Sequence, residues 1–192
     1  MNIANRITVF RIVLAFIFIF LIFSQGLWAK VGALAVFVIA AISDFLDGYI
    51  AHKRNMVTDF GKIMDPIADK ILVLSAFTCF VQMQLIESWM FMIIIFRELL
   101  ITSLRLFALS KGHVVAASKA GKHKTVSQLT VIIFILIFIL AKEAMLTYTT
   151  WNPVWEKFFL NGIFVMMLIT VGLTLFSGFS YLWENRKLLS RN

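Results

Sequence analysis

Cysteine and proline are almost absent from this 192-residue sequence. The single cysteine, Cys79, excludes an intrachain disulfide, and its apolar neighbours favour a small core residue. The only two prolines are Pro66 and Pro153, so long stretches contain no proline that would break a helix. The sequence therefore predicts an all-α fold built from long helices.

Charged residues are also scarce, at 15% of the chain against 61% hydrophobic residues, and the mean hydropathy is +0.92. These values are typical of a membrane protein and unlike those of a soluble domain. The formal net charge of +8 would suit either nucleic acid or the anionic face of a membrane. The hydropathy favours the membrane, and no nucleic-acid partner is expected.

Apolar runs predict a polytopic protein with six transmembrane helices in a single domain, residues 1–192. The expected spans are 10–27, 31–51, 61–84, 88–109, 125–141 and 158–183. Residues 1–11 carry two arginines among apolar residues, which predicts a short interfacial helix before the first span. A cleaved signal peptide is the alternative for this start, but no A-x-A-like site follows, so we expect a retained helix.

The basic residues divide unevenly between the two sides of these spans. Twelve lie in one set of loops and ends: Arg6, Arg11, Lys53, Arg54, Lys62, Lys111, Lys119, Lys122, Lys124, Arg186, Lys187 and Arg191. Three lie in the other set: Lys30, Lys142 and Lys157. Positive residues concentrate in the cytoplasmic loops of membrane proteins, so both termini and residues 52–60 and 111–124 are predicted to be cytoplasmic.

All five aspartates lie between positions 43 and 70, and four of them form two helical pairs. Asp44 and Asp47 are spaced i,i+3, Asp65 and Asp69 are spaced i,i+4, and each pair therefore shares one helix face. Carboxylates at membrane depth are costly and usually mark a function. Four converging carboxylates would repel one another unless cations bridge them, which predicts Mg²⁺ or Mn²⁺.

Other interpretations of these residues remain open. The aspartates would cap helices or pair with Lys62 and Lys70 if they were purely structural, an explanation that suits one aspartate better than four. Two further charges within the fourth span, Arg97 and Arg105, predict a polar cavity, because an arginine facing lipid is unfavourable. The neighbouring Glu98 would either line that cavity or tie helices together.

The acidic stretch resembles the signature of the CDP-alcohol phosphotransferase family, D-x2-D-G-x2-A-R-x8-G-x3-D-x3-D. Seven of its eight fixed positions match: Asp44, Asp47, Gly48, Ala51, Gly61, Asp65 and Asp69. The family's arginine is replaced by His52, a departure that Lys53 or Arg54 would have to offset. Glycine and alanine beside the aspartates would let a ligand approach the helix backbone.

The resemblance implies an enzyme that transfers a substituted phosphate from a CDP-linked donor to an alcohol and releases CMP. It implies two divalent ions held by Asp44, Asp47, Asp65 and Asp69, with Asp69 also acting as the catalytic base. The residues it implies for nucleotide binding are Thr8, Gly48, Ala51, His52, Thr58 and Gly61.

Three more stretches, MNIANRITVFRI, VTDFGKIMDPIADK and FRELLITSLR with AGKHKT, resemble bacterial family members that use glycerol 3-phosphate. This likeness implies CDP-diacylglycerol as donor, a homodimer, and a bacterial inner or plasma membrane location with a cytoplasmic active site. The acceptor phosphate would be bound by Arg97, Arg105, Lys122 and Lys124.

Three alternatives stay open. Lys122 and Lys124 would also fit a basic loop attracted to anionic lipid. Another alcohol, such as serine, inositol phosphate or phosphatidylglycerol, would fit the same signature. A divalent-cation transporter is a different class, disfavoured because residues 31–40 and 71–81 contain no charge that would continue a path across the membrane.

Overall fold

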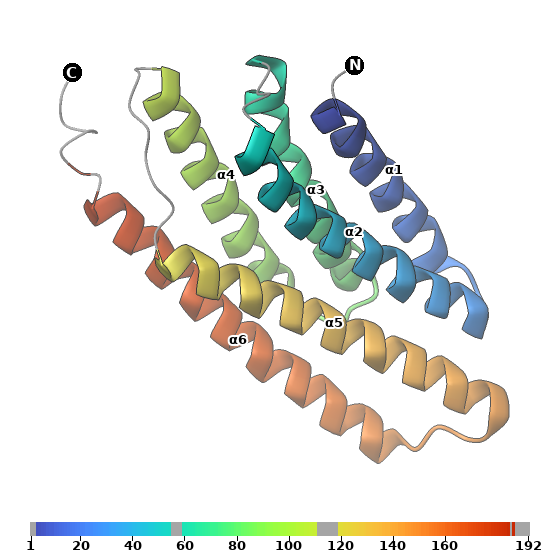
Figure 1. Cartoon of the computed structure of the whole chain (residues 1–192). Helices are drawn as coiled ribbons and strands as arrows, with labels where there is room; N and C mark the ends of the chain where they lie inside the picture. The colour runs from blue at the N-terminus through green and yellow to red at the C-terminus, as the bar shows by residue number, and fades with distance from the viewer. Residues whose placement is uncertain (1–2, 55–58, 111–118, 185, 187–192) are drawn as a thin grey trace.

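The computed structural model describes the backbone of residues 3–54, 59–110, 119–184 and 186, and the side chains of 9–43, 70–108, 121, 123–184 and 186. The described part consists of helices joined by short connections and contains no strand. The helices are α1 (Ile3–Phe23), α2 (Leu27–Arg54), α3 (Asp59–Gln82), α4 (Ser88–Ser110), α5 (Lys119–Tyr148) and α6 (Pro153–Glu184) (Figure 1). The predicted all-α fold is confirmed, and each predicted span falls on one of these helices.

Two boundaries differ from the prediction. The short helix expected at residues 1–11 is not a separate element, because α1 runs without interruption from Ile3 to Phe23. No proline or glycine interrupts this stretch, so nothing in the sequence separates an interfacial turn from the span. The first break comes at Gly26, whose φ of 96° lies in the left-handed region that glycine adopts without strain.

The second difference lies in α5, which extends beyond the predicted 125–141 at both ends. Lys124 therefore belongs to a helix, where a basic loop was expected. At the other end only a short connection joins α5 to α6, and Lys142 Nζ forms a 2.6 Å ion pair with Glu156 across it. Trp151 Nε1 also donates to Glu156, at 3.2 Å, which ties the connection to α6.

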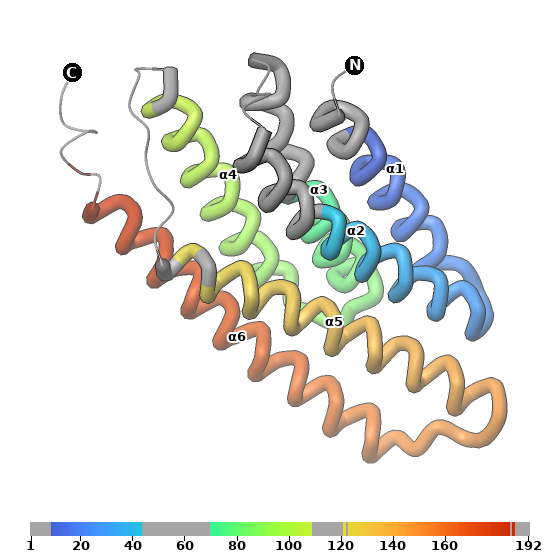
Figure 2. The backbone as a smooth tube through the Cα atoms, in the orientation of Figure 1, coloured from blue at the N-terminus to red at the C-terminus, as the bar shows by residue number. Residues whose placement is uncertain are grey.

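The helices pack as a bundle in which α1 contacts α2 and α3, while α5 contacts α2 and α6. Helix α4 lies against α6, and α5 and α6 run side by side as a long antiparallel pair, which Figure 2 traces as a tube. The core between them contains fully buried phenylalanines from four helices: Phe18, Phe37, Phe77, Phe80 and Phe138. The rings of Phe18 and Phe37 meet with centroids 5.7 Å apart.

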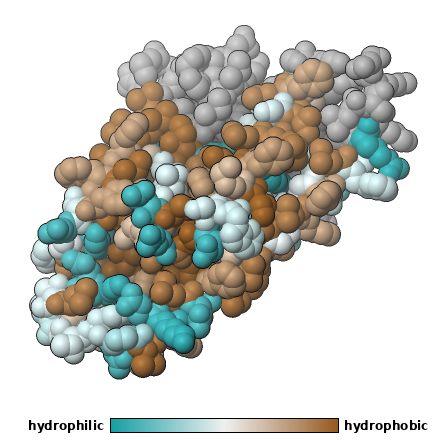
Figure 3. Space-filling model, turned by 180° about the vertical axis from the view of Figure 1, so that it is seen from behind, coloured by the Kyte–Doolittle hydropathy of each residue, from teal (hydrophilic) through white to brown (hydrophobic). Residues whose placement is uncertain are grey.

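The outer surface is also apolar, with Phe16, Phe20, Phe176 and Phe179 each about two-thirds or more exposed. Figure 3 shows hydrophobic side chains over much of the rear face, with many hydrophilic ones at the end that carries the α5–α6 connection. In lipid, a bundle that is apolar both inside and outside gains little free energy when apolar side chains move from the lipid into its core. Close packing and internal polar contacts must then hold its helices together.

Within the described residues, two segments are long and apolar enough to cross a membrane, His123–Tyr148 and Pro153–Glu184. Shorter apolar segments occur at Val9–Phe23, Leu27–Ser43 and Lys70–Gln82. Spanning of the membrane by all six helices therefore remains a prediction.

Candidate active site

The two aspartate pairs fall on adjacent helices. Asp44 and Asp47 belong to the second half of α2, and Asp65 and Asp69 belong to the first half of α3. Their side chains lie outside the described residues, so their mutual distances stay predictions. The surroundings of six other predicted site residues also lie outside the description, namely Thr8, Gly48, Ala51, His52, Gly61 and Lys122. Thr58 lies wholly outside the described part. Among the side chains that are described, no group of three or more His, Cys, Asp or Glu residues could hold a metal ion.

Lys70, the first α3 residue whose side chain is described, belongs to a cluster of charged side chains centred on Glu98 of α4. The Glu98 carboxylate of α4 is buried, with 5% of the residue exposed. Its Oε2 atom lies 2.9 Å from Lys70 Nζ on α3. Its Oε1 atom is paired with Lys124 Nζ on α5 and lies 3.5 Å from Arg97 Nη1. One carboxylate thus joins cations from three helices, and we call Lys70, Arg97, Glu98 and Lys124 the Glu98 cluster.

Lys70 makes further contacts on the same turn of α4. Its ammonium group donates to the backbone carbonyl of Glu98 at 3.2 Å and to the hydroxyl of Thr102. The Thr102 hydroxyl in turn donates to the Glu98 carbonyl at 2.6 Å. Lys70 directly follows Asp69 in the sequence, so this contact fixes α3 immediately after the second aspartate pair.

The positions of Glu98 and Lys124 follow from helix periodicity. On α4 the buried residues Met90, Ile94 and Ile101 form one stripe, and Glu98 occupies the position on that stripe between Ile94 and Ile101. A polar residue at such a position is buried with its apolar neighbours and must find partners. The sequence is compatible with two roles for Glu98, and this spacing is the signal that identifies it as an internal residue.

Lys124 is buried in the same way. It lies one helical turn before the buried Gln128, whose Nε2 atom is 3.5 Å from Glu98 Oε1, and the stripe continues through Val131 and Ile135. With 4% of the residue exposed, Lys124 does not have the setting of a solvated basic loop.

Arg97 links α4 to α6. Its Nη2 atom donates to Ser177 Oγ at 2.7 Å, and Gly178 lies directly beneath its side chain. A Cβ atom at Gly178 would approach Arg97 Cγ to 3.3 Å, so the glycine leaves room for the guanidinium stem. In the part of the chain that is described, Arg97 Nε and Thr174 Oγ1 are buried without a hydrogen-bond partner. The described contact between α4 and α6 therefore contains two unsatisfied hydrogen-bonding groups, and one of them, Arg97 Nε, belongs to the Glu98 cluster.

The predicted acceptor-binding residues are only partly brought together. Arg97 and Lys124 meet on the same carboxylate oxygen of Glu98. Arg105 lies roughly two helical turns further along α4 and has an exposed side chain. The contacts of Lys70 with Glu98 and Thr102 were not predicted from the sequence.

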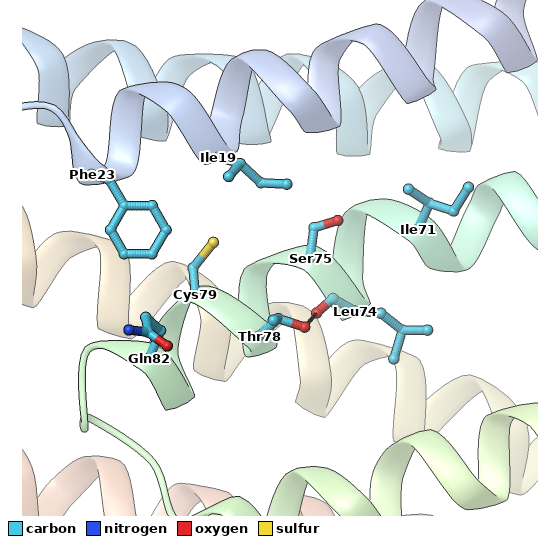
Figure 4. A pocket seen from close by; sticks show the side chains of 8 residues that line it. All are labelled: Ile19, Phe23, Ile71, Leu74, Ser75, Thr78, Cys79 and Gln82. Carbon is cyan, nitrogen blue, oxygen red and sulfur yellow. Dashed lines mark hydrogen bonds between the residues drawn. The ribbon is translucent and has the colours of Figure 1, made fainter.

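An open cavity of about 390 Å³ lies between α1 and α3 (Figure 4). Its walls come from Ile19 and Phe23 on α1 and from Ile71, Leu74, Ser75, Thr78, Cys79 and Gln82 on α3. The one hydroxyl bond drawn there, from Thr78 Oγ1 to the Leu74 carbonyl at 2.8 Å, stays within α3. None of the described side chains that line the cavity is charged, so it suits an apolar group better than a phosphate.

Comparison with known proteins gives a family match over most of the chain. The model of the CDP-alcohol phosphatidyltransferase family matches residues 1–176.

Several similar proteins share the name CDP-diacylglycerol–glycerol-3-phosphate 3-phosphatidyltransferase. The protein from Bacillus subtilis (strain 168) is 40% identical over 149 residues, which cover 71% of this chain and 77% of that protein. The proteins from Pseudomonas fluorescens and Escherichia coli (strain K12) are 32% and 31% identical, and the matches cover 97% and 94% of this chain. In both cases 93% of the relative is covered, so the likeness extends nearly from end to end.

Proposed function

We propose, because the chain belongs to the CDP-alcohol phosphatidyltransferase family, that it transfers the phosphatidyl group of CDP-diacylglycerol to glycerol 3-phosphate. The products are phosphatidylglycerophosphate and CMP, which makes the protein a transferase of phospholipid biosynthesis. The observation that carries this proposal is the near full-length likeness to relatives that bear the name of this reaction.

The four paired aspartates have the donor chemistry of a divalent-cation site. Carboxylate oxygens are the ligands that Mg²⁺ and Mn²⁺ prefer, and two pairs suit two ions. We assign the ions to Asp44, Asp47, Asp65 and Asp69. When bound, they would supply positive charge to neutralise the oxygens of the CDP diphosphate.

Helix periodicity supports the convergence of the two pairs. On α2, Ala33, Phe37 and Ala40 are buried, and the same spacing continued along a regular helix reaches positions 44 and 47.

A similar stripe occurs on α3. Leu72, Ala76 and Phe80 are buried, and extending their spacing toward the start of the helix reaches positions 69 and 65. On regular helices both acidic pairs would therefore continue stripes that face the interior of the bundle. That agreement favours one shared site over two separate exposed ones.

In the reaction we assign to this site, Asp69 removes the proton from a glycerol hydroxyl group. The hydroxyl oxygen then forms a bond to the phosphorus that carries diacylglycerol. The bond from that phosphorus to the bridging oxygen of CMP breaks, and CMP leaves with the electron pair. Gly48, Ala51 and Gly61, with Thr8, His52 and Thr58, would contact the nucleotide.

The charge balance of the Glu98 cluster supports binding of the acceptor phosphate nearby. Lys70, Arg97 and Lys124 surround the single carboxylate of Glu98. Three cations around one anion leave positive charge in a buried setting, and an anionic ligand would neutralise it. We assign the acceptor phosphate to Arg97 and Lys124 together with Arg105 and Lys122.

The setting we propose is a six-span protein of a bacterial inner or plasma membrane, folded as one domain over residues 1–192 and acting as a homodimer. Both termini and the active site would face the cytoplasm. The apolar outer surface and the twelve-to-three distribution of basic residues support this arrangement.

The decisive experiment is a CMP-release assay on the purified protein in detergent with CDP-diacylglycerol. Glycerol 3-phosphate is compared with serine, inositol phosphate, phosphatidylglycerol and no acceptor, each with Mg²⁺ or Mn²⁺. We expect release to depend on glycerol 3-phosphate and on the metal. Faster release with another alcohol would replace the acceptor assignment, and release without any alcohol would contradict transfer.

A further inference from the structure

Glu98 stands apart from the other polar residues because it is a buried anion that touches three helices without belonging to the acidic signature. Its two carboxylate oxygens bind different partners: Oε2 lies 2.9 Å from Lys70 Nζ of α3, and Oε1 is paired with Lys124 of α5. The carboxylate is therefore placed where α3, α4 and α5 come together.

The contact with Lys70 is the one that reaches the acidic stretch. Lys70 donates to the Glu98 carboxylate, to the Glu98 carbonyl and to the Thr102 hydroxyl, all within one turn of α4. Three acceptors around one ammonium group fix both the axial position and the rotation of α3 relative to α4. Since Lys70 is next to Asp69, the same contact fixes the segment that carries the second aspartate pair.

We infer that Glu98 is a positioning residue, which through Lys70 holds the α3 segment of Asp65 and Asp69 in the orientation that binds divalent cations. This inference rests on the proposed function for the metal site. We assign no substrate or metal contact to Glu98, and its proposed effect on the metal site acts through Lys70 and the placement of α3.

The negative charge of Glu98 is essential to this role. Without it, Lys70, Arg97 and Lys124 would share a buried space with no anion among the described residues of the cluster. Like charges in a poorly solvated interior repel strongly, so the Lys70 side chain would move away from α4. The segment of α3 before Lys70 would then change its position relative to α4. Glutamine at position 98 keeps the shape and a hydrogen-bond acceptor but removes the charge. Aspartate keeps the charge at a shorter reach.

The test measures Mn²⁺ binding to the purified full chain by electron paramagnetic resonance titration, which needs no turnover. We expect Glu98→Gln to raise the Mn²⁺ dissociation constant about fivefold or more, and Glu98→Asp to raise it less. Lys70→Met should weaken binding as well, and the double variant should bind no more weakly than Glu98→Gln alone, because both changes break one link.

A matched control is Glu156→Gln, which removes the carboxylate from the Lys142 ion pair at the α5–α6 connection. It should bind Mn²⁺ as the unchanged protein does. A purely structural role for Glu98 would lower the melting temperature or the fraction of binding-competent protein but leave the dissociation constant unchanged. If Glu98→Gln fails to fold, Glu98→Asp and Lys70→Met still decide the matter.

Unchanged Mn²⁺ affinity in these variants, or effects of Glu98→Gln and Lys70→Met that multiply in the double variant, would overturn the inference. So would absence of Mn²⁺ binding by the unchanged protein. The proposed function has a separate readout: if CMP release does not depend on glycerol 3-phosphate, the acceptor assignment fails while the Mn²⁺ titrations still report on Glu98.

Discussion

Glu98 and Lys124 occupy helix positions that continue stripes of buried apolar side chains. Each is stabilised there by the other, since a lone buried charge would be far more costly than a paired one. The same reasoning applies to the aspartates of the signature, which would need bound cations if they face the interior as helix periodicity predicts. At the scale of single residues, the buried charges of Glu98 and Lys124 depend on one another.

Replacing any one of Asp44, Asp47, Asp65 and Asp69 with asparagine should lower turnover about 100-fold or more. Asparagine keeps the size of the side chain but loses its charge and its strength as a metal ligand. The first three changes should also raise the Mn²⁺ dissociation constant, whereas Asp69→Asn should affect it less if proton removal is its main task. CMP release and Mn²⁺ titration measure the two effects, and near-normal turnover in any of the four variants would refute the assignment.

His52 departs from the family signature, which has arginine at this position. Arginine is always charged, whereas histidine with an ordinary pKa of about 6.5 is mostly neutral at pH 7. His52→Arg should therefore lower the Michaelis constant for CDP-diacylglycerol, by about tenfold if it restores one charge-assisted hydrogen bond of roughly 1.5 kcal/mol. The gain should be larger at pH 8 than at pH 6, because His52 is neutral at the higher pH. An unchanged Michaelis constant at both pH values would remove His52 from the site.

At the scale of elements, hydropathy was sufficient to locate the helices but not their ends. Residues 119–124 are polar and basic, so a hydropathy criterion assigns them to a loop, yet they form the first turns of α5. The ion pair of Lys124 with Glu98 explains this, and it joins residues that are distant in the sequence. Pairing across helices is not encoded in any local pattern, which is why the acidic signature was predictable and the Glu98 cluster was not.

The seam between α4 and α6 offers a test of helix packing on one element. Gly178 and Gly172 both lie within α6, and alanine at either should gain helix propensity of about 0.8–1 kcal/mol. A Cβ atom at Gly178 would approach Arg97 Cγ to 3.3 Å, whereas one at Gly172 would have no atom of another described helix within 4 Å.

Gly178→Ala should therefore be less stable than Gly172→Ala by about 1 kcal/mol. Arg97 cannot retreat freely because Ser177 and Glu98 hold its guanidinium group. Thermal unfolding in detergent compares the two variants, and the difference between them cancels the shared propensity gain. Equal melting temperatures would show that Arg97 accommodates the methyl group at no cost.

At the scale of the whole molecule, the orientation in the membrane decides whether the substrates can reach the site. Glycerol 3-phosphate and the charged head group of CDP-diacylglycerol would reach the site from the cytoplasm if both substrates are made there. The predicted cytoplasmic loops and ends bear twelve of the fifteen basic residues assigned to loops and ends, the other three being Lys30, Lys142 and Lys157. Residue 55 lies between α2 and α3, and Thr149 lies between α5 and α6. Three helices separate the two positions, so they fall on opposite sides if each helix crosses the membrane.

This arrangement predicts the outcome of cysteine labelling in intact cells. In a Cys79→Ser background, Thr149→Cys should react with a membrane-impermeant maleimide added from outside, because the Thr149 side chain is exposed and its loop is predicted to face outward. Asn55→Cys should react only after the membrane is permeabilised. The opposite pattern would invert the orientation and place the acidic pairs on the outer face. Labelling of both positions from outside would mean that at least one of α3, α4 and α5 does not cross the membrane, which would refute the six-span topology while leaving the helical bundle itself intact.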